Sequence, residues 1–209
     1  MPKTLRFQAL YQVVLFLTVL AFCIAFVINF QPLYYYFADH QHLAQSVSLT
    51  KEGLRSNYQH LLNYLNFPWI KELQLTLPSS PSGLQHFADV KKLFLLDYAV
   101  LLCGMPISIW YLRKLVKQGL LWTLIVPAQI ILAGTAVLAV MMTLSFQQFF
   151  VYFHKLLFRN NDWLFDPLKD PIINALPDEF FFACFGLFFV LFVGGLLGMI
   201  WIGKRSLKK

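Results

Sequence analysis

Two histidines of this 209-residue sequence stand near carboxylates, beside apolar stretches of membrane-helix length. His86 is three residues before Asp89, a spacing that puts both side chains on one face of a helix. His154 precedes a polar segment that contains Asp162 and Asp166. Because imidazole takes up or releases a proton near neutral pH and a carboxylate can orient it, these groups predict general acid and base catalysis. The alternative is that each histidine is a structural residue at the membrane interface.

Two further side chains near the histidines are candidates for a supporting role. Asp97 follows His86 by eleven positions, on nearly the same line of a helix and about 16 Å further along it. An ionisable group inside an apolar span is costly, so Asp97 is by default a functional-site hypothesis. The alternative is that Asp97 makes a structural hydrogen bond or ion pair. Trp163 is interpreted as a substrate contact or an aromatic anchor at the membrane surface.

The sequence offers little for a metal ion or a covalent nucleophile. All three cysteines lie in apolar runs and fit no metal-ligand spacing, so we expect no metal and no cofactor. Cys184, near the start of the last apolar run, is the one cysteine close enough to the predicted site to serve as a nucleophile. The Asp-Pro pairs at 166–167 and 170–171 are typical of turns.

The composition indicates a membrane protein. Apolar residues make up 58% of the chain and charged residues 13%, against about 25% charged in an average soluble domain. Four stretches reach the ~20 residues that a helix needs to cross a bilayer core. Since none alternates with period two, we predict an all-α integral membrane protein with a single domain over residues 1–209. Its spans are residues 9–30, 93–112, 120–146 and 180–202.

The charges predict the direction of these spans. Nine of the 17 basic residues and none of the ten acidic ones lie in segments 1–8, 113–119 and 203–209. The positive-inside rule therefore puts both termini in the cytoplasm and segments 31–92 and 147–179 outside, with the histidines. The net charge of +7 then reflects the membrane topology, and we expect membrane lipids as partners and no nucleic acid.

The first outer segment is expected to form a small extracytoplasmic cap between the first two membrane helices. Residues 48–66 carry an apolar stripe at helical spacing, with Ser48 or Thr50 as the capping residue. Residues 70–78 alternate leucines with polar side chains, which predicts a short strand. A helix that begins near Leu84 is expected to run into the second span. The stripe consists of Leu54, Tyr58, Leu61, Leu62 and Leu65.

Three stretches of the chain resemble one enzyme family, and with the order of spans the resemblance covers nearly the whole sequence. They are HFADVKKLF (86–94), the long segment FHKLLFRNNDWLFDPLKDPIINALPDEFF (153–181), and YLNFP (64–68). The family is the lipoprotein intramolecular transacylases (Lit) of Gram-positive bacteria. The resemblance implies a cell-membrane acyltransferase whose active site faces the extracytoplasmic leaflet and whose substrate is a diacylglyceryl lipoprotein. Such enzymes move the ester-linked acyl chain from the middle glycerol position to the α-amino group of the N-terminal cysteine.

The histidines of that family map onto His86 and His154. We hypothesise that one is the base and the other the acid or oxyanion donor, with Asp89 orienting one ring and Asp162 or Asp166 the other. The sequence leaves their division of labour open. It also leaves two alternative functions: another outer-leaflet acyltransferase or hydrolase, and a non-enzymatic transporter subunit or scaffold.

Overall fold

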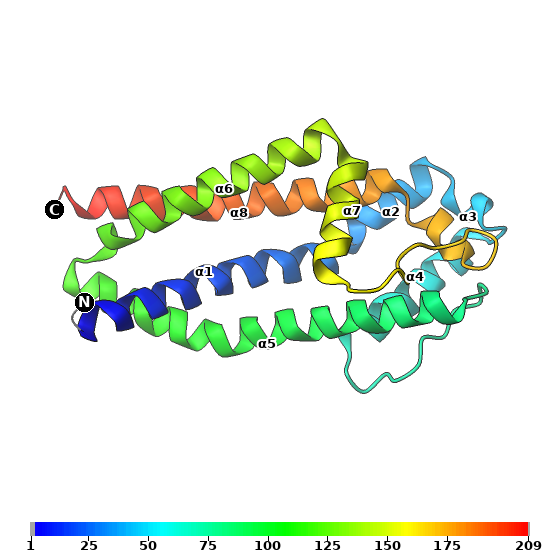
Figure 1. The fold of residues 1–209 in the computed structure, drawn as a ribbon, viewed down its shortest axis with the longest axis horizontal. Coiled ribbons are helices and arrows are strands. Elements are labelled where there is room, and N and C mark those ends of the chain that lie inside the picture. The colour runs from blue at the N-terminus through cyan, green and yellow to red at the C-terminus, as the bar shows by residue number, and fades with distance from the viewer. Residues whose placement is uncertain (1–2, 209) are drawn as a thin grey trace. The chain divides into compact units, whose positions relative to one another are not determined.

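The computed structural model describes residues 3–208, with side chains from residue 8 onward. Both ends of the predicted domain, Met1 and Lys209, and the side chains of Lys3 and Arg6 used for the topology lie outside the described residues. The helices are shown in Figure 1. In chain order they are α1 (Lys3–Asn29), α2 (Gln31–His40), α3 (Leu43–Ser46), α4 (Lys51–Asn66), α5 (Pro81–Gln118), the 3₁₀ helix η1 (Leu121–Leu124), α6 (Ile125–Leu144), α7 (Phe146–Leu157), the 3₁₀ helix η2 (Pro171–Ala175) and α8 (Asp178–Ser206).

Within the described residues, four helical segments are long and apolar enough to cross a membrane. This confirms the prediction of an all-α protein with four membrane helices. The segments are Gln8–His40, Pro81–Gln118, Leu121–Leu144 and Asp178–Ser206. The second is 38 residues long and therefore extends well past the predicted span at 93–112. The predicted single domain stays a prediction; by backbone contacts the chain divides into two compact units.

The first unit contains most of α1, the C-terminal parts of α5 and α8, and α6. Gln12 on α1 donates a hydrogen bond from Nε2 to the carbonyl oxygen of Thr123 at 3.2 Å. Near the other end of the chain, Gly203 on α8 lies so close to η1 that a Cβ there would be 3.1 Å from the Leu121 carbonyl oxygen. The first turns of α1 and the last turns of α8 therefore meet η1 at one end of this unit. That this end is cytoplasmic stays a prediction.

The second unit contains Ile28–Leu96 and Leu144–Phe185, and its core confirms the predicted amphipathic helix. All five residues of the apolar stripe on α4 are buried. Tyr58 of that stripe stacks on Tyr34 of α2, with ring centroids 3.5 Å apart. Of the two predicted caps it is Thr50 that begins the helix, since its Oγ1 accepts a hydrogen bond from Gly53 N at 3.0 Å.

The predicted strand at 70–78 is wrong: residues 3–208 contain no β-strand. The alternation of its leucines does describe burial, because Leu77 is buried and Leu73 and Leu75 are half-buried against the core. The segment has no neighbouring strand to pair with. Its Thr76 N–H instead donates to Asn57 Oδ1 of α4 at 2.8 Å, so a side chain takes the place of a sheet ladder.

Candidate active site

His86 lies in the second turn of α5, inside an aromatic pocket of the second unit. Its side chain is only 6% exposed. The rings of Phe158 and Phe165 stand edge-on to it, at centroid distances of 4.9 and 5.5 Å. The Nδ1 atom of His86 is buried and has no hydrogen-bond partner within residues 3–208. A buried polar atom in this state costs roughly 1–3 kcal/mol, which a polar group of a substrate could recover.

His154 lies in the last turn of α7 and is 8% exposed. Its Nδ1 is 2.8 Å from the carbonyl oxygen of Phe150, one turn earlier in the helix. A carbonyl can only accept, so the proton of the neutral ring sits on Nδ1 and Nε2 keeps its lone pair. The indole of Trp163 packs against the ring at a centroid distance of 5.0 Å. This tautomer is the one that a general base acting through Nε2 requires.

The fold brings the two histidines together from α5 and α7. Their ring centroids are 5.8 Å apart with an interplanar angle of 37°, and Phe158 packs against both rings. Burial lowers the pKa of His154 below its ordinary value, because the apolar surroundings disfavour the imidazolium; the Phe150 carbonyl opposes this only in part. His154 is therefore neutral at physiological pH and able to accept a proton.

The predicted carboxylate partners do not touch the rings. Asp89 accepts hydrogen bonds from Gln85, Lys92 and Asn160, and within the described part of the chain it makes none with His86. Because Asn160 follows α7, Asp89 ties α5 to the loop that carries Trp163. The hydrogen bond that fixes the tautomer of His154 therefore comes from a backbone carbonyl and not from Asp89.

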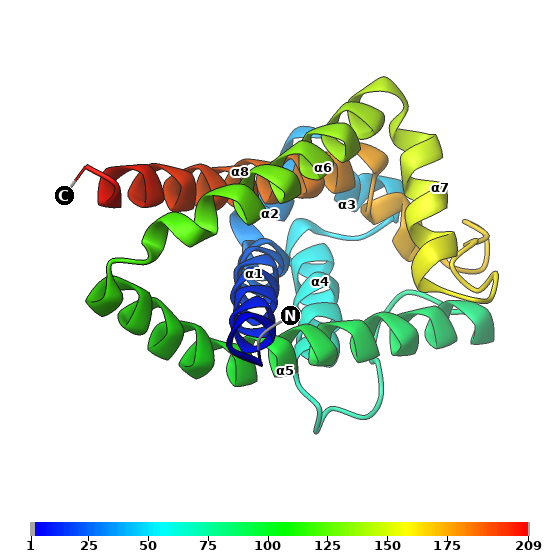
Figure 2. The same cartoon turned by 60° about the vertical axis from the view of Figure 1, so that its left-hand side comes forward.

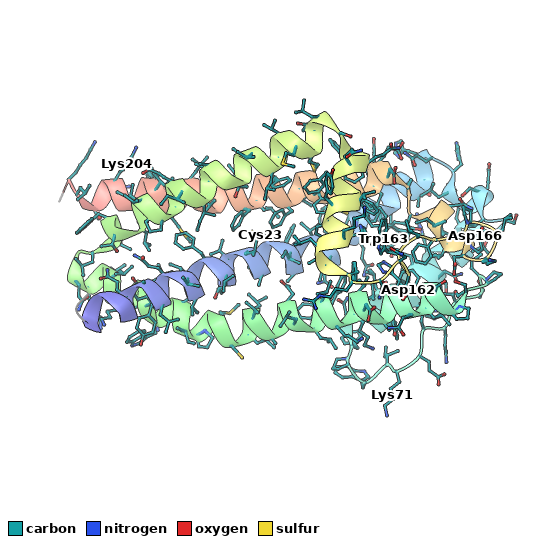
Figure 3. The ribbon with its side chains drawn as sticks, in the orientation of Figure 1. Cys23, Lys71, Asp162, Trp163, Asp166 and Lys204 are labelled. Atoms are coloured by element: carbon teal, nitrogen blue, oxygen red, sulfur yellow. The ribbon has the colours of Figure 1, made fainter. Side chains whose placement is uncertain are left out.

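The remaining candidates of this group lie in the loop after α7. Asp166 accepts from the backbone N of Leu168 at 3.0 Å, as a turn residue does. The backbone N of Asp162 donates to the Asn160 side chain. Asp162, Trp163 and Asp166 are labelled in Figure 3. Trp163 is half-buried against His154, and its Nε1 donates to the Asn160 carbonyl oxygen at 3.1 Å.

Two further candidates make no hydrogen bond with either histidine among residues 3–208. Asp97 belongs to the first unit, where its Oδ2 atom is buried without a hydrogen-bond partner among residues 3–208. Cys184 packs against the core of the second unit as a partly buried residue.

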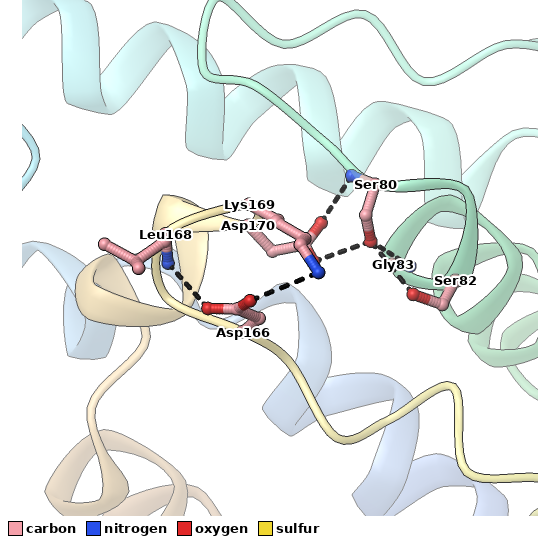
Figure 4. Close-up of polar contacts among 7 residues, drawn as sticks. All are labelled: Ser80, Ser82, Gly83, Asp166, Leu168, Lys169 and Asp170. Atoms are coloured by element: carbon pink, nitrogen blue, oxygen red, sulfur yellow. Dashed lines mark hydrogen bonds and ion pairs between the residues drawn. The ribbon is translucent and has the colours of Figure 1, made fainter.

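Asp170 is a positioning residue that the sequence analysis missed, since its Asp-Pro context suggested only a turn. It is 2% exposed and lies just before η2. Its two carboxylate oxygens accept from the backbone N and the Oγ of Ser80, each at 2.7 Å, as Figure 4 shows. The Ser80 Oγ in turn accepts from Gly83 N at 3.0 Å, which is the bonding of a helix N-cap. The carboxylate also complements the positive end of the α5 dipole.

The close approach of Asp170 depends on glycine at position 83. A Cβ there would overlap the Asp170 carboxylate and lie 2.9 Å from Cε1 of Phe165. Phe165 is one of the rings around His86, so the cap, the glycine and the aromatic pocket form one packed corner at the start of α5. A sequence signal existed in Ser80-Pro81, because serine followed by proline is a common helix start.

Replacing the buried carboxylate tests this corner. Asp170→Ala leaves the N–H and hydroxyl of Ser80 without their partner, and we expect a loss of roughly 1–3 kcal/mol in stability. The measurement is thermal unfolding of the purified protein in detergent, with Asp166→Ala as the matched control in the same loop. Asp166 is partly exposed, so equal melting temperatures for the two variants would contradict the assignment.

Comparison with known proteins gives one consistent result. The family model of the lipoprotein intramolecular transacylase Lit matches residues 9–181. A structure of the membrane-integral Lit from Bacillus cereus is similar at 29% identity and a TM-score of 0.86, over 97% of both chains. Two structures of the same protein with one histidine replaced, by arginine or by alanine, give 28% identity and TM-scores of 0.76 and 0.78. They are matched over 93% and 94% of their length and 97% of this chain. No curated protein sequence matched.

Proposed function

Because the chain belongs to the lipoprotein intramolecular transacylase family, Lit, we propose that it moves an acyl chain within a diacylglyceryl lipoprotein. Family membership makes it an acyltransferase of the membrane that acts on lipoproteins. The finer proposal is that the chain on the middle glycerol oxygen goes to the α-amino group of the N-terminal cysteine. The observation that carries it is the pair of buried histidines, 5.8 Å apart, in a pocket of aromatic rings.

The reaction forms a C–N bond and breaks a C–O bond. The amine attacks the ester carbonyl and loses a proton, and the secondary glyceryl oxygen leaves and gains one. His154 is the base, because its Nε2 lone pair is free while Nδ1 is held by the Phe150 carbonyl. His86 donates to the ester oxygens, since its buried Nδ1 lacks a partner that a substrate oxygen would provide.

The proton balance closes within the pair. His154 then passes the proton that it took from the amine to the departing glyceryl oxygen, while the neutral ring of His86 keeps its own proton and only donates a hydrogen bond, so both rings are neutral at the end. Donor and acceptor belong to one lipoprotein molecule, so the enzyme has mainly to hold amine and ester in contact. The aromatic surroundings favour transfer to the amine over hydrolysis, because they leave little room for water around the rings.

Replacing the histidines tests the proposal. We expect His86→Ala and His154→Ala each to lower the rate of transacylation by ~10²–10⁴-fold, as for the loss of a general acid or base. The readout is mass spectrometry of the N-terminal lipopeptide after incubation with a diacylglyceryl lipoprotein in vesicles. His60→Ala, on the exposed face of α4, is the control and should keep full activity. If either site variant folds and still converts substrate at the control rate, the histidine roles are wrong.

The protonation state of His154 can be measured directly. Since burial lowers its pKa, the ring should stay neutral to a lower pH than a free imidazole, with a midpoint below about 6.5. NMR titration of protein labelled at histidine, with His154→Gln to assign the signal, gives that midpoint. The stability that this neutral ring contributes is fully present above the unfolded-state pKa of about 6.5 and is lost as the pH falls from there through the lower folded-state pKa. A midpoint at or above 6.5 would contradict a buried neutral base.

We also propose that this site faces the extracytoplasmic side, on the strength of the positive-inside charge pattern. Single cysteines at Asn161, in the loop after α7, and at Gln118, at the end of α5, are exposed positions that test it. The background should carry Cys103→Ser, because Cys103 is exposed. A membrane-impermeant maleimide should label Asn161→Cys on intact cells and Gln118→Cys only after lysis. The reverse pattern would invert the proposed topology.

A further inference from the structure

Helix α7 carries His154 on its buried face and apolar side chains on its exposed face. Tyr152 and Leu156 stand two residues to either side of His154, about 200° around the helix, and so point away from the histidine. They are 58% and 82% exposed. Exposed apolar side chains of this size on one helix face indicate a surface that meets something other than water.

The length of α7 excludes a membrane crossing. Its 12 residues span roughly 18 Å, well short of the ~30 Å of a hydrocarbon core. It begins directly after the candidate membrane helix α6, which ends at Leu144, with only the extended residue Ser145 between them. By position in the chain, α7 therefore starts where a span has just ended.

The packing of α7 independently locates it at the end of a membrane helix. Its phenylalanines pack against the first two turns of α8, with Phe149 and Phe153 each 5.0 Å from the ring of Phe185 and Phe146 5.5 Å from Phe182. Within this unit α7 crosses the directions of α8 and the start of α5 in both views (Figures 1 and 2). Helices α5 and α8 both continue into candidate spans, so within this unit α7 crosses the first turns of two membrane helices.

The charges around the exposed face suit a lipid surface. Lys155 and Arg159 flank it, and both are exposed. The sequence has no acidic residue between Asp97 and Asp162, so these cations have no acidic neighbour along α7. Apolar side chains beside basic ones are typical of helices that lie in the headgroup region of a bilayer.

We propose that α7 is an interfacial helix whose Tyr152 and Leu156 face sits at the boundary between lipid headgroups and acyl chains. Such helices bury their apolar face about 5–10 Å into this boundary. The consequence for catalysis, which rests on the proposed function, is that the bilayer sets the depth of His154. The histidine then meets the ester of a membrane-anchored substrate without lifting it out of the leaflet.

The position of α7 can be measured without any assay of activity. A fluorescent label at Leu156→Cys, in the Cys103→Ser background, is reconstituted in vesicles of phosphatidylcholine and phosphatidylglycerol. Lipids carrying a nitroxide near the headgroup should quench it more strongly than lipids carrying one deep in the chain. The matched controls are two labelled positions. Glu52→Cys, at an exposed position of α4, should be quenched by aqueous iodide, and Leu102→Cys on α5 should be quenched best by the deep nitroxide.

Two outcomes would overturn the proposal. One is quenching of the Leu156 label by iodide as strongly as at Glu52; the other is quenching by none of these agents, which would mean that protein covers this face.

A second variant, Leu156→Glu, should lower conversion of lipoprotein in vesicles roughly tenfold, or ~1.4 kcal/mol, while conversion in detergent is unchanged. Equal loss in both would also contradict it. If the unmodified protein transfers no acyl chain at all, the proposed function fails, and the quenching result still decides the place of α7.

Discussion

The histidine pocket depends on one contact, in which the buried carboxylate of Asp170 accepts two hydrogen bonds from Ser80. This contact joins the loop before α8 to the first turn of α5, two segments that are 90 residues apart in the chain. A carboxylate at 2% exposure is tolerated only where its hydrogen bonds are satisfied, and here the backbone N–H and the hydroxyl of Ser80 at the helix start provide them. Once α5 begins at this point, the helical repeat fixes the direction in which His86 projects six residues later.

The surroundings of the two imidazoles explain why the site is built from phenylalanine and tryptophan rather than from further polar groups. An apolar shell keeps His154 neutral by making its charged form unfavourable, which is the state required of a base. The same shell limits water, the competing nucleophile in an acyl transfer. Carboxylates directly on the rings would have worked against the first effect, because they favour the imidazolium. The structure keeps Asp89 engaged with Gln85, Lys92 and Asn160 instead.

The sequence alone predicted the parts of the fold that depend on local pattern. Four long apolar runs predict membrane helices, and the stripe on α4 follows from helical spacing. The preference for serine or threonine as a cap left Ser48 and Thr50 open, and the structure has Thr50. The strand at 70–78 was mispredicted because alternation reports which side chains are buried, whereas a strand also needs a partner. That partner is absent among residues 3–208, and the side chain of Asn57 replaces it.

The candidate site likewise has features that local sequence pattern predicts and features that depend on tertiary contacts. His86 and His154 were identifiable because each stands where an apolar helix meets a polar segment. Their contact, and the role of Asp170, depend on a tertiary arrangement that no local spacing encodes. Asp170 and Asp166 both precede a proline, yet one is buried under a helix start and the other lies in an exposed turn. Sequence context could not separate them, since the space for the Asp170 carboxylate is left by Gly83, which lies far away in the chain.

Helix α7 links the chemistry of this pocket to the membrane. One face must be apolar enough to seal the aromatic pocket, and the opposite face carries Tyr152 and Leu156 with a basic flank. A helix of this kind in water would expose apolar surface on its outer side for no gain in stability. At a lipid boundary the same residues are buried, and each contributes favourably to the placement of the helix. The depth of His154 in the membrane then follows from how deeply its own helix partitions into the lipid boundary. The ester of a substrate anchored in the leaflet lies at a fixed depth, so the histidine has to match that depth.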